Sequence, residues 1–162
     1  MSSLPNSLAG CRSLALIAAA IVAGVLSGCS GAAPPRATVS DARIRDRSPE
    51  AAVVEFAVEA TNPNDIELPL RDITYSVSID GRQVFSGRRE AMATIPRGGA
   101  QRVYLPAVIP MGGAGTEPGV HRYTLRGRMR YSLPSQLADV LFDAKISRPG
   151  VSFSDEGEID LR

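Results

Sequence analysis

Residues Val53 to Gly81 read VVEFAVEATNPNDIELPLRDITYSVSIDG, and this stretch decides the fold. It contains two runs that alternate between apolar and polar residues, separated by Asn62-Pro63-Asn64. A period of two is typical of half-buried strands, which place one face in a core and the other in water. Asp80-Gly81 supplies the positive φ angles of a two-residue hairpin turn. The stretch therefore predicts an antiparallel β unit.

The first run also predicts which side chains are buried. Val54, Phe56 and Val58 share one face of the strand, and Glu55 and Glu59 share the other. We expect the apolar face to lie in a core. We expect both carboxylates to lie on a solvated outer face, where a change to alanine costs little.

Further short motifs follow this stretch in a characteristic order. They are Leu68-Pro69-Leu70, Tyr75, Gly87, Ile95-Pro96, Val103, Leu105-Pro106, Tyr123, Leu125 and Gly127. Together with Asn62-Pro63-Asn64 and Asp80-Gly81 they resemble the late-embryogenesis-abundant group 2 (LEA14-like) proteins, whose module is the water-stress and hypersensitive-response domain. The resemblance covers residues 37–132. It implies a β-sandwich and a non-enzymatic role in desiccation or other water stress.

Residues 1–28 are expected to be a signal peptide outside the fold. Leu14 to Leu26 is an apolar run that is too short for a comfortable membrane span but suits a signal-peptide core. It leads into Leu26-Ser27-Gly28-Cys29, which resembles the bacterial lipobox. We therefore expect Cys29 to be lipidated and to become the mature N-terminus. An ordinary secretory signal or a short membrane anchor is the alternative.

Lipidation of Cys29 would place the protein at a bacterial cell envelope. Two or three acyl chains, at about 0.8 kcal/mol per buried CH₂, make such attachment effectively permanent. Ser30 resembles the residue that sends lipoproteins to the outer membrane by default in some bacteria, so we expect the periplasmic face of that membrane. Residues 29–36 are expected to form a tether after the lipidated cysteine. Cys11 lies in the discarded segment, which leaves no thiol for a disulfide or a metal.

The mature chain, residues 29–162, is long enough for one domain with its own core. The full sequence has 18 Lys and Arg against 17 Asp and Glu, and removal of Arg12 with the signal makes the two equal. Nucleic-acid binding calls for a basic surface, so a neutral domain is a poor candidate for it.

Later residues extend the strand pattern. Residues 37–45 and 101–109 read as strands, and Pro106 points to a sheet edge because it has no N–H to donate. Residues 140–146 are expected to be the last core strand, extended by Val151 and Phe153, and residues 155–162 a polar tail. The prediction is an all-β fold, a single antiparallel sandwich of about seven strands over residues 37–154, close to the fibronectin type III or immunoglobulin-like arrangement. Its expected core comprises Val54, Phe56, Val58, Tyr75, Val77, Leu105, Leu125 and Phe142.

The strand expected over residues 120–131 carries a row of arginines on one face. These are Arg122, Arg126, Arg128 and Arg130. One interpretation is a solvated sheet face that pairs with carboxylates such as Asp139 and Asp143 on the next strand. The other is an anion-facing surface for lipid headgroups or an acidic partner.

Residues typical of catalysis are sparse. His121 is the only histidine, and no serine lies in a Gly-x-Ser-x-Gly elbow. The one acidic cluster, residues 155–160, falls in the expected tail, and the glycine-rich residues 111–119 lack the Gly-Lys-Ser/Thr ending of a phosphate loop. We therefore expect no enzyme, metal or cofactor. Two functions stay open: a protective surface near the membrane, and a binding module that holds a protein or glycan partner.

Overall fold

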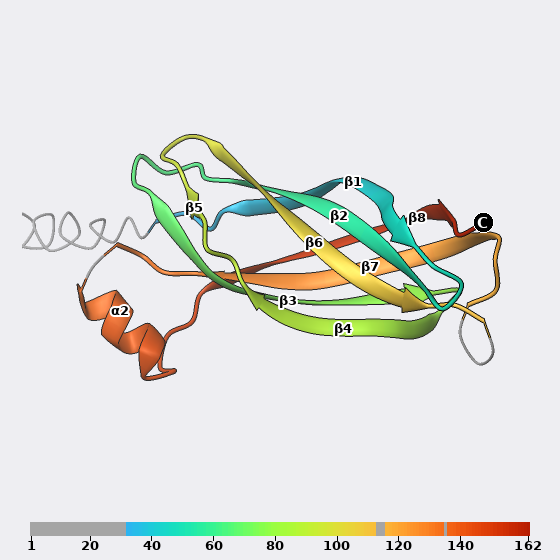
Figure 1. Ribbon diagram of the computed structural model, residues 1–162. Helices are drawn as coiled ribbons and strands as arrows, with labels where there is room; N and C mark the ends of the chain where they lie inside the picture. Colours follow the sequence, from blue (N-terminus) through green and yellow to red (C-terminus); the bar gives the residue numbers. More distant parts are fainter. Residues whose placement is uncertain (1–31, 113–115, 135) are drawn as a thin grey trace, which may run out of the picture. The chain divides into compact units, whose positions relative to one another are not determined.

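Two antiparallel sheets pack against each other in the computed structural model, which describes residues 32–112, 116–134 and 136–162 (Figure 1). The smaller sheet has the strand order β1-β2-β6, with strands Arg36–Arg47, Ala51–Thr61 and Ala100–Pro110. The larger sheet has the order β4-β3-β7-β8, with strands Arg82–Glu90, Leu68–Ile79, Val120–Tyr131 and Gly150–Asp160. The two-residue β5 (Thr94–Ile95) pairs with β3, and helix α2 (Gln136–Asp143) follows β7.

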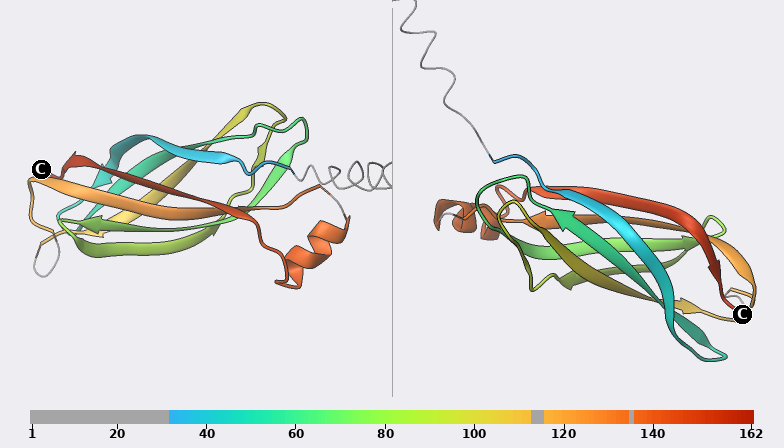
Figure 2. Two further views of the ribbon diagram at one scale, coloured as in Figure 1. Left: turned by 180° about the vertical axis from the view of Figure 1, so that it is seen from behind. Right: turned by 90° about the horizontal axis from the view of Figure 1, so that it is seen from above.

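This arrangement confirms the predicted all-β sandwich. The described residues form eight strands, of which the short β5 is one, in place of about seven. Figure 2 shows the two layers from behind and from above, with α2 lying outside them at one end of the sandwich. The strands begin at residue 36 and end at residue 160, so the folded unit extends beyond the expected 37–154.

The alternation in β2 and β3 has the facing that the sequence predicts. Val54, Phe56 and Val58 of β2 are fully buried in the core between the sheets. Asp80 and Gly81 form the turn between β3 and β4 with φ of 49° and 82°, which confirms the predicted two-residue hairpin.

Strand β6 is an edge strand, as Pro106 predicts. The carbonyl of Pro106 accepts a hydrogen bond of 2.5 Å from the hydroxyl of Tyr75 in the opposite sheet. The carbonyl of Tyr104 accepts one of 2.7 Å from Arg89 of β4. Side chains of the larger sheet therefore satisfy backbone acceptors of β6, which protects this edge from pairing with another chain.

Aromatic rings in the core lie directly against glycines of neighbouring strands. Gly127 of β7 stands between Tyr75 of β3 and Phe153 of β8 in the register. A Cβ at position 127 would lie 2.2 Å from Cζ of Phe153, so no larger residue fits without moving the ring. Gly157 of β8 makes the same kind of close approach to the ring of Tyr123.

The expected last strand is wrong. Residues 140–143 belong to helix α2, and Val140 and Ile146 are 63% and 74% exposed, so the apolar alternation there does not mark a core face. The last strand is β8, which also takes up most of the expected polar tail at residues 155–162. Ile159 of β8 and Leu161 directly after it are buried, whereas the outward acids of β8 give this stretch its polar composition.

Phe142 is buried, as expected, but lies outside the cluster of residues that forms the sandwich core. Its ring is contacted by the guanidinium carbons of Arg71 and Arg148, 5.4 and 5.2 Å from the ring centroid. Cation–π contacts of this kind stabilise a ring at the surface of the sandwich. Phe142 therefore fastens α2 to the larger sheet. The other seven residues of the expected core are all buried in it.

Candidate functional site

The arginines of β7 lie on the outer face of the larger sheet, as the alternation predicts. Arg126 and Arg128 are exposed, and neither has an ion-pair partner among residues 32–112, 116–134 and 136–162. Their cross-strand neighbours on β3 and β8 all carry hydroxyl groups: Thr74, Ser76, Ser152 and Ser154. These two guanidinium groups therefore stand over a surface of hydrogen-bonding side chains.

A third arginine joins them from β4. A shallow depression on this face is lined by Arg88, Arg126 and Arg128 together with Thr74, Ser76 and Ser86, and no acidic residue lines it. Guanidinium and hydroxyl groups are donors that suit carboxylate and phosphate oxygens. We call the set Arg88, Arg126, Arg128, Thr74, Ser76, Ser86, Ser152 and Ser154 the arginine–hydroxyl face.

Of the other two arginines of the predicted row, Arg130 has an ion-pair partner and Arg122 has none among the described residues. Arg130 Nη1 lies 3.3 Å from one carboxylate oxygen of Asp72, and Arg88 Nη2 lies 3.2 Å from the other. Asp72 is only 5% exposed because these two side chains cover it. Arg122 stands opposite Glu158 of β8 in the register. The row is therefore partly an internally paired face and partly a free one.

The partners that the sequence suggested for this row are wrong. Asp139 and Asp143 lie in α2 rather than on the next strand. Asp139 forms an ion pair with Arg71 of β3. The next strand is β8, whose outward acids Glu156 and Glu158 lie opposite Thr124 and Arg122.

The smaller sheet carries a matching buried carboxylate on its own outer face. Glu55 of β2 is 6% exposed, contrary to the expected solvated position. Its two oxygens accept hydrogen bonds of 2.8 Å from Arg43 and 2.6 Å from Arg45, both on β1. The hydrogen bond from Arg43, followed by that from Arg45, lowers the pKa of Glu55 even though burial opposes this. Glu59 stays partly exposed, as expected, and pairs with Arg102.

His121 links two loops at the end of the sandwich opposite α2. Its Nδ1 lies 2.6 Å from a carboxylate oxygen of Asp80, and its Nε2 lies 2.7 Å from the carbonyl oxygen of Glu117. Both partners are acceptors, and only the imidazolium form donates from both ring nitrogens. The hydrogen bond with Asp80 accordingly raises the pKa of His121 and lowers that of Asp80. The arrangement favours the imidazolium form of His121 and makes it a structural bridge between Asp80 and Glu117.

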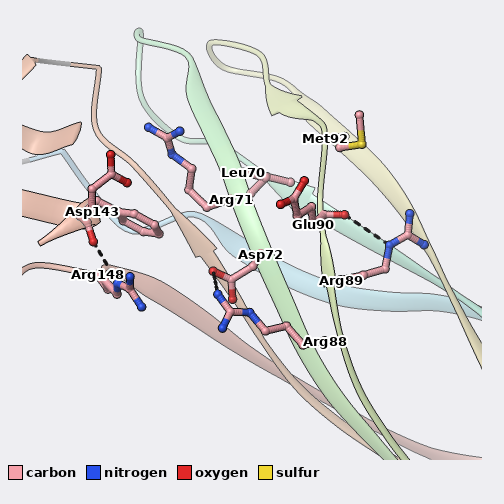
Figure 3. Close-up of a pocket in the computed structure, with 10 residues that line it drawn as sticks. Leu70, Arg71, Asp72, Arg88, Arg89, Glu90, Met92, Asp143 and Arg148 are labelled. Carbon is pink, nitrogen blue, oxygen red and sulfur yellow. Dashed lines mark hydrogen bonds and ion pairs between the residues drawn. The ribbon is translucent and has the colours of Figure 1, made fainter. Parts of the chain in front are cut away.

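A pocket lies where α2 meets strands β3 and β4 (Figure 3). Arg71 and Arg148 stand on it beside Phe142, and Met92 lies at the β4 side with its side chain 90% exposed. The acidic residues Asp72, Glu90 and Asp143 also line it, so its charges are mixed. This pocket carries no single-sign charge that would select an anion or a cation.

The Asn-Pro-Asn motif joins three segments of the chain. The buried side chain of Asn62 donates to the carbonyls of Ile66, at 2.6 Å, and Pro96, at 3.1 Å. Asn64 accepts a hydrogen bond of 2.8 Å from the N–H of Ala33 and donates one of 2.9 Å to its carbonyl. The motif thus fixes residue 33, inside the expected tether of residues 29–36, to the sandwich.

The described part of the chain contains no group of three or more His, Cys, Asp or Glu side chains that could hold a metal ion. Among the same residues, no helix has both the length and the apolar character needed to cross a bilayer. Cys29, Cys11 and the expected signal peptide at residues 1–28 lie outside the described residues.

Sequence reasoning missed the buried Asp72 and the bridge from Asn64 to Ala33. The pairing of Asp72 could have been predicted once the strand order was known, because arginines stand near it on both neighbouring strands in the register. No such signal marks Ala33, since its contacts are made by backbone atoms.

Comparisons with known proteins bear on both fold and family. The sequence model of the LEA_2 family, described as late embryogenesis abundant protein, matches residues 57–145. The solution structure of AT1g01470 from Arabidopsis thaliana is similar with a TM-score of 0.60 and 17% identity, over 81% of this chain and 84% of that one. A solution structure of a candidate late embryogenesis abundant (LEA) protein, At2g46140.1, has a TM-score of 0.58 and 16% identity, over 93% and 86%. A comparison with curated protein sequences found no significant match.

Proposed function

This chain belongs to the late embryogenesis abundant protein family, and from that premise we propose that it is a non-enzymatic water-stress protein held by a lipid on Cys29 at a bacterial cell envelope. Its module is the water-stress and hypersensitive-response domain. It acts there through its folded surface on the membrane or on protein neighbours, so its effect is stoichiometric. The lipobox-like sequence Leu26 to Cys29 supports the anchor, and Ser30 supports the periplasmic face of the outer membrane.

The observation that carries the proposal is the arginine–hydroxyl face. Arg126 and Arg128 are free of ion pairs within the described residues and stand among serine and threonine hydroxyls. When water is withdrawn, anionic groups of neighbouring molecules lose their solvent donors. Guanidinium groups replace such donors well because charge-assisted hydrogen bonds are about twice as strong as neutral ones. The face therefore offers water-replacing contacts to phosphate and carboxylate groups.

The domain itself is built to stay folded while it does so. In the described residues, no buried side-chain nitrogen or oxygen lacks a hydrogen-bond partner. The two carboxylates buried on the outer faces, Glu55 and Asp72, are each held by two arginines. Internal pairing of this kind does not depend on bulk water to satisfy the charges.

A complementation series tests this function. We expect a deletion strain to grow normally in dilute medium and to survive drying or strong osmotic shock less well. Wild-type protein and the His121→Ala variant should restore survival, because no acid–base chemistry is involved. Cys29→Ser should fail to restore it, should lack acyl labelling and should leave an unprocessed precursor, whereas Cys11→Ser should behave as wild type.

A binding module with an anionic protein or glycan partner is the second candidate, and the same face favours it. It predicts a growth or permeability defect in unstressed cells, and full loss of rescue from changes at Arg126 and Arg128 alone. Normal survival of the deletion strain through drying, together with such a defect, would replace the stress function by the binding function.

A further inference from the structure

The tether enters the sandwich at a fixed point. Ala33 is held by two hydrogen bonds to Asn64, and Pro35 behind it is buried before β1 begins at Arg36. Cys29 lies four residues before Ala33. Four residues of extended chain span at most about 14 Å. If Cys29 carries lipid, as the proposed function holds, the end of the sandwich around Asn64 lies within that distance of the bilayer surface.

The same end collects the most exposed large apolar side chains of the described residues. Met92 is 90% exposed, Ile146 74% and Val140 63%, and each exceeds the exposure of Val120, Val108, Tyr104 and Ile66. Met92 follows β4 and shares its pocket with Phe142 at the end of α2. Figure 1 shows α2 and β5 at the end of the sandwich where the described chain begins.

The backbone has an uncommon conformation at one of these residues and directly before another. Met92 has φ of 47°, and Lys145, directly before Ile146, has φ of 63°. Positive φ is uncommon for residues other than glycine and is maintained only where the surrounding structure requires it. The corner at residue 92 therefore holds an apolar side chain out toward solvent at a cost in backbone energy, whereas the left-handed Lys145 ends α2, with the N–H of Ile146 donating to the carbonyl of Leu141.

Charges at this end are mixed. The exposed residues include Arg97 and Lys145 as well as Glu67 and Asp143. Attraction to anionic headgroups is therefore small, and the contact depends on apolar side chains. This separates it from the arginine–hydroxyl face, whose binding would fall with salt.

We propose that Met92, Val140 and Ile146 form a membrane-facing tip that enters the headgroup region of the phospholipid bilayer to which the chain is tethered. The lipid supplies the attachment, and the tip sets the orientation of the domain. The long axes of the strands then point away from the bilayer, because α2 follows one end of β7 and residues 116–119 precede its other end. The inference rests on the proposed lipid anchor.

Single tryptophans test the tip, because the chain contains none. The full-length protein is purified from membranes as Met92→Trp, Ile146→Trp or Val120→Trp and reconstituted into vesicles of zwitterionic phospholipid that contains brominated acyl chains. We expect blue-shifted emission and bromine quenching at positions 92 and 146, with little change between low and high salt. Val120→Trp, at the far end, should keep solvent-like, unquenched emission. Adding Val140→Ser and Met92→Ser to the Ile146→Trp protein should reduce its quenching.

The experiment distinguishes an error in the proposed membrane-facing tip from an error in the proposed lipidation of Cys29. Mass spectrometry of the peptide that contains Cys29 reports lipidation in the same samples. If Cys29 is unmodified, the anchor is wrong, and the reporters are repeated in the Cys11→Ser protein with Cys29 coupled to a maleimide lipid. Equal quenching at positions 146 and 120, or solvent-like emission at 92 and 146 on tethered protein, overturns the tip.

Discussion

Arg45 forms an ion pair with Glu55 on the outer face of the smaller sheet, with 2.6 Å between Nη1 of Arg45 and Oε2 of Glu55. Arg43 binds the other oxygen, so an acid on a strand face that alternation marks as outward is removed from water by its own partners. The carboxylate neutralises two guanidinium groups that stand close together on β1. Its removal leaves them to repel each other.

We therefore expect Glu55→Ala to destabilise the domain clearly more than Glu59→Ala, whose carboxylate is partly exposed. Phe56→Ala, which empties a fully buried site, should cost about 3–5 kcal/mol. Urea unfolding of the three variants gives the comparison. Equal free energies of unfolding for Glu55→Ala and Glu59→Ala would contradict the buried ion-pair assignment.

Gly127→Ala should destabilise the domain by about 1–3 kcal/mol, as overpacking does. The new methyl group would meet the ring of Phe153 at 2.2 Å. Phe153→Leu in the same chain frees space and should recover part of the loss, so the two changes are non-additive. Gly81→Ala is a useful contrast, because its φ of 82° rather than a steric clash makes it unfavourable, and Phe153→Leu should not rescue it.

The His121 bridge should make stability depend on pH. Its pKa is raised in the folded state, so its contribution is complete below about pH 6.5 and is lost as pH rises through the folded pKa. The pKa of Asp80 is lowered, so its contribution is present above about pH 4 and is lost as pH falls through the folded pKa. The free energy of unfolding of the wild type should exceed that of His121→Ala most between about pH 4 and pH 6.5.

Urea unfolding at pH 5.5 and pH 9 checks this bridge. Asp80→Asn is the matched control, since asparagine tolerates the left-handed turn and removes the charge. The excess stability of wild type over Asp80→Asn should also shrink at pH 9. A stability difference that is the same at both pH values would show that His121 is not charged in the bridge.

The arginine–hydroxyl face predicts binding to anionic vesicles that weakens as salt rises. Changing Arg126 and Arg128 to glutamine should abolish that binding and leave the melting temperature nearly unchanged. Arg130→Gln should lower the melting temperature, because it uncovers Asp72, and should leave vesicle binding in place, because Arg126 and Arg128 are unchanged. Flotation assays and thermal melts of the two variants measure both effects. Vesicle binding that survives the double change would assign it elsewhere.

Local pattern was sufficient for the central strands. The alternation in β2 and β3, the Asp80-Gly81 turn and the edge position of Pro106 follow from contacts within a strand or across one turn. Local pattern did not identify the last strand, because residues 140–146 and β8 both alternate with a period of two. The stretch at Val140 has more apolar residues, yet β8 forms the strand because Gly157 and Phe153 fit the rings and glycines of β7. That fit is tertiary and cannot be read from β8 alone.

The site was predictable only in part for a related reason. Alternation gives the face on which Arg122 to Arg130 lie, but not which of them meet an acid. Asp72 takes up Arg130 through the pairing of β3 with β7, which no spacing in the sequence specifies. Glu55 was misjudged in the same way, since its cover comes from side chains of β1.

The placement of β8 also affects how fast the domain folds. The first and last strands, β1 and β8, pack beside each other, so one edge of the sandwich is assembled from residues far apart in the sequence. Loop closure over so many residues is slow, and folds dominated by such pairs take milliseconds to seconds. Until β8 docks, Gly127 and Tyr123 lack the strand that covers them. A chain that is still being synthesised therefore lacks one edge of the sandwich, and the fold closes only after its last strand has arrived.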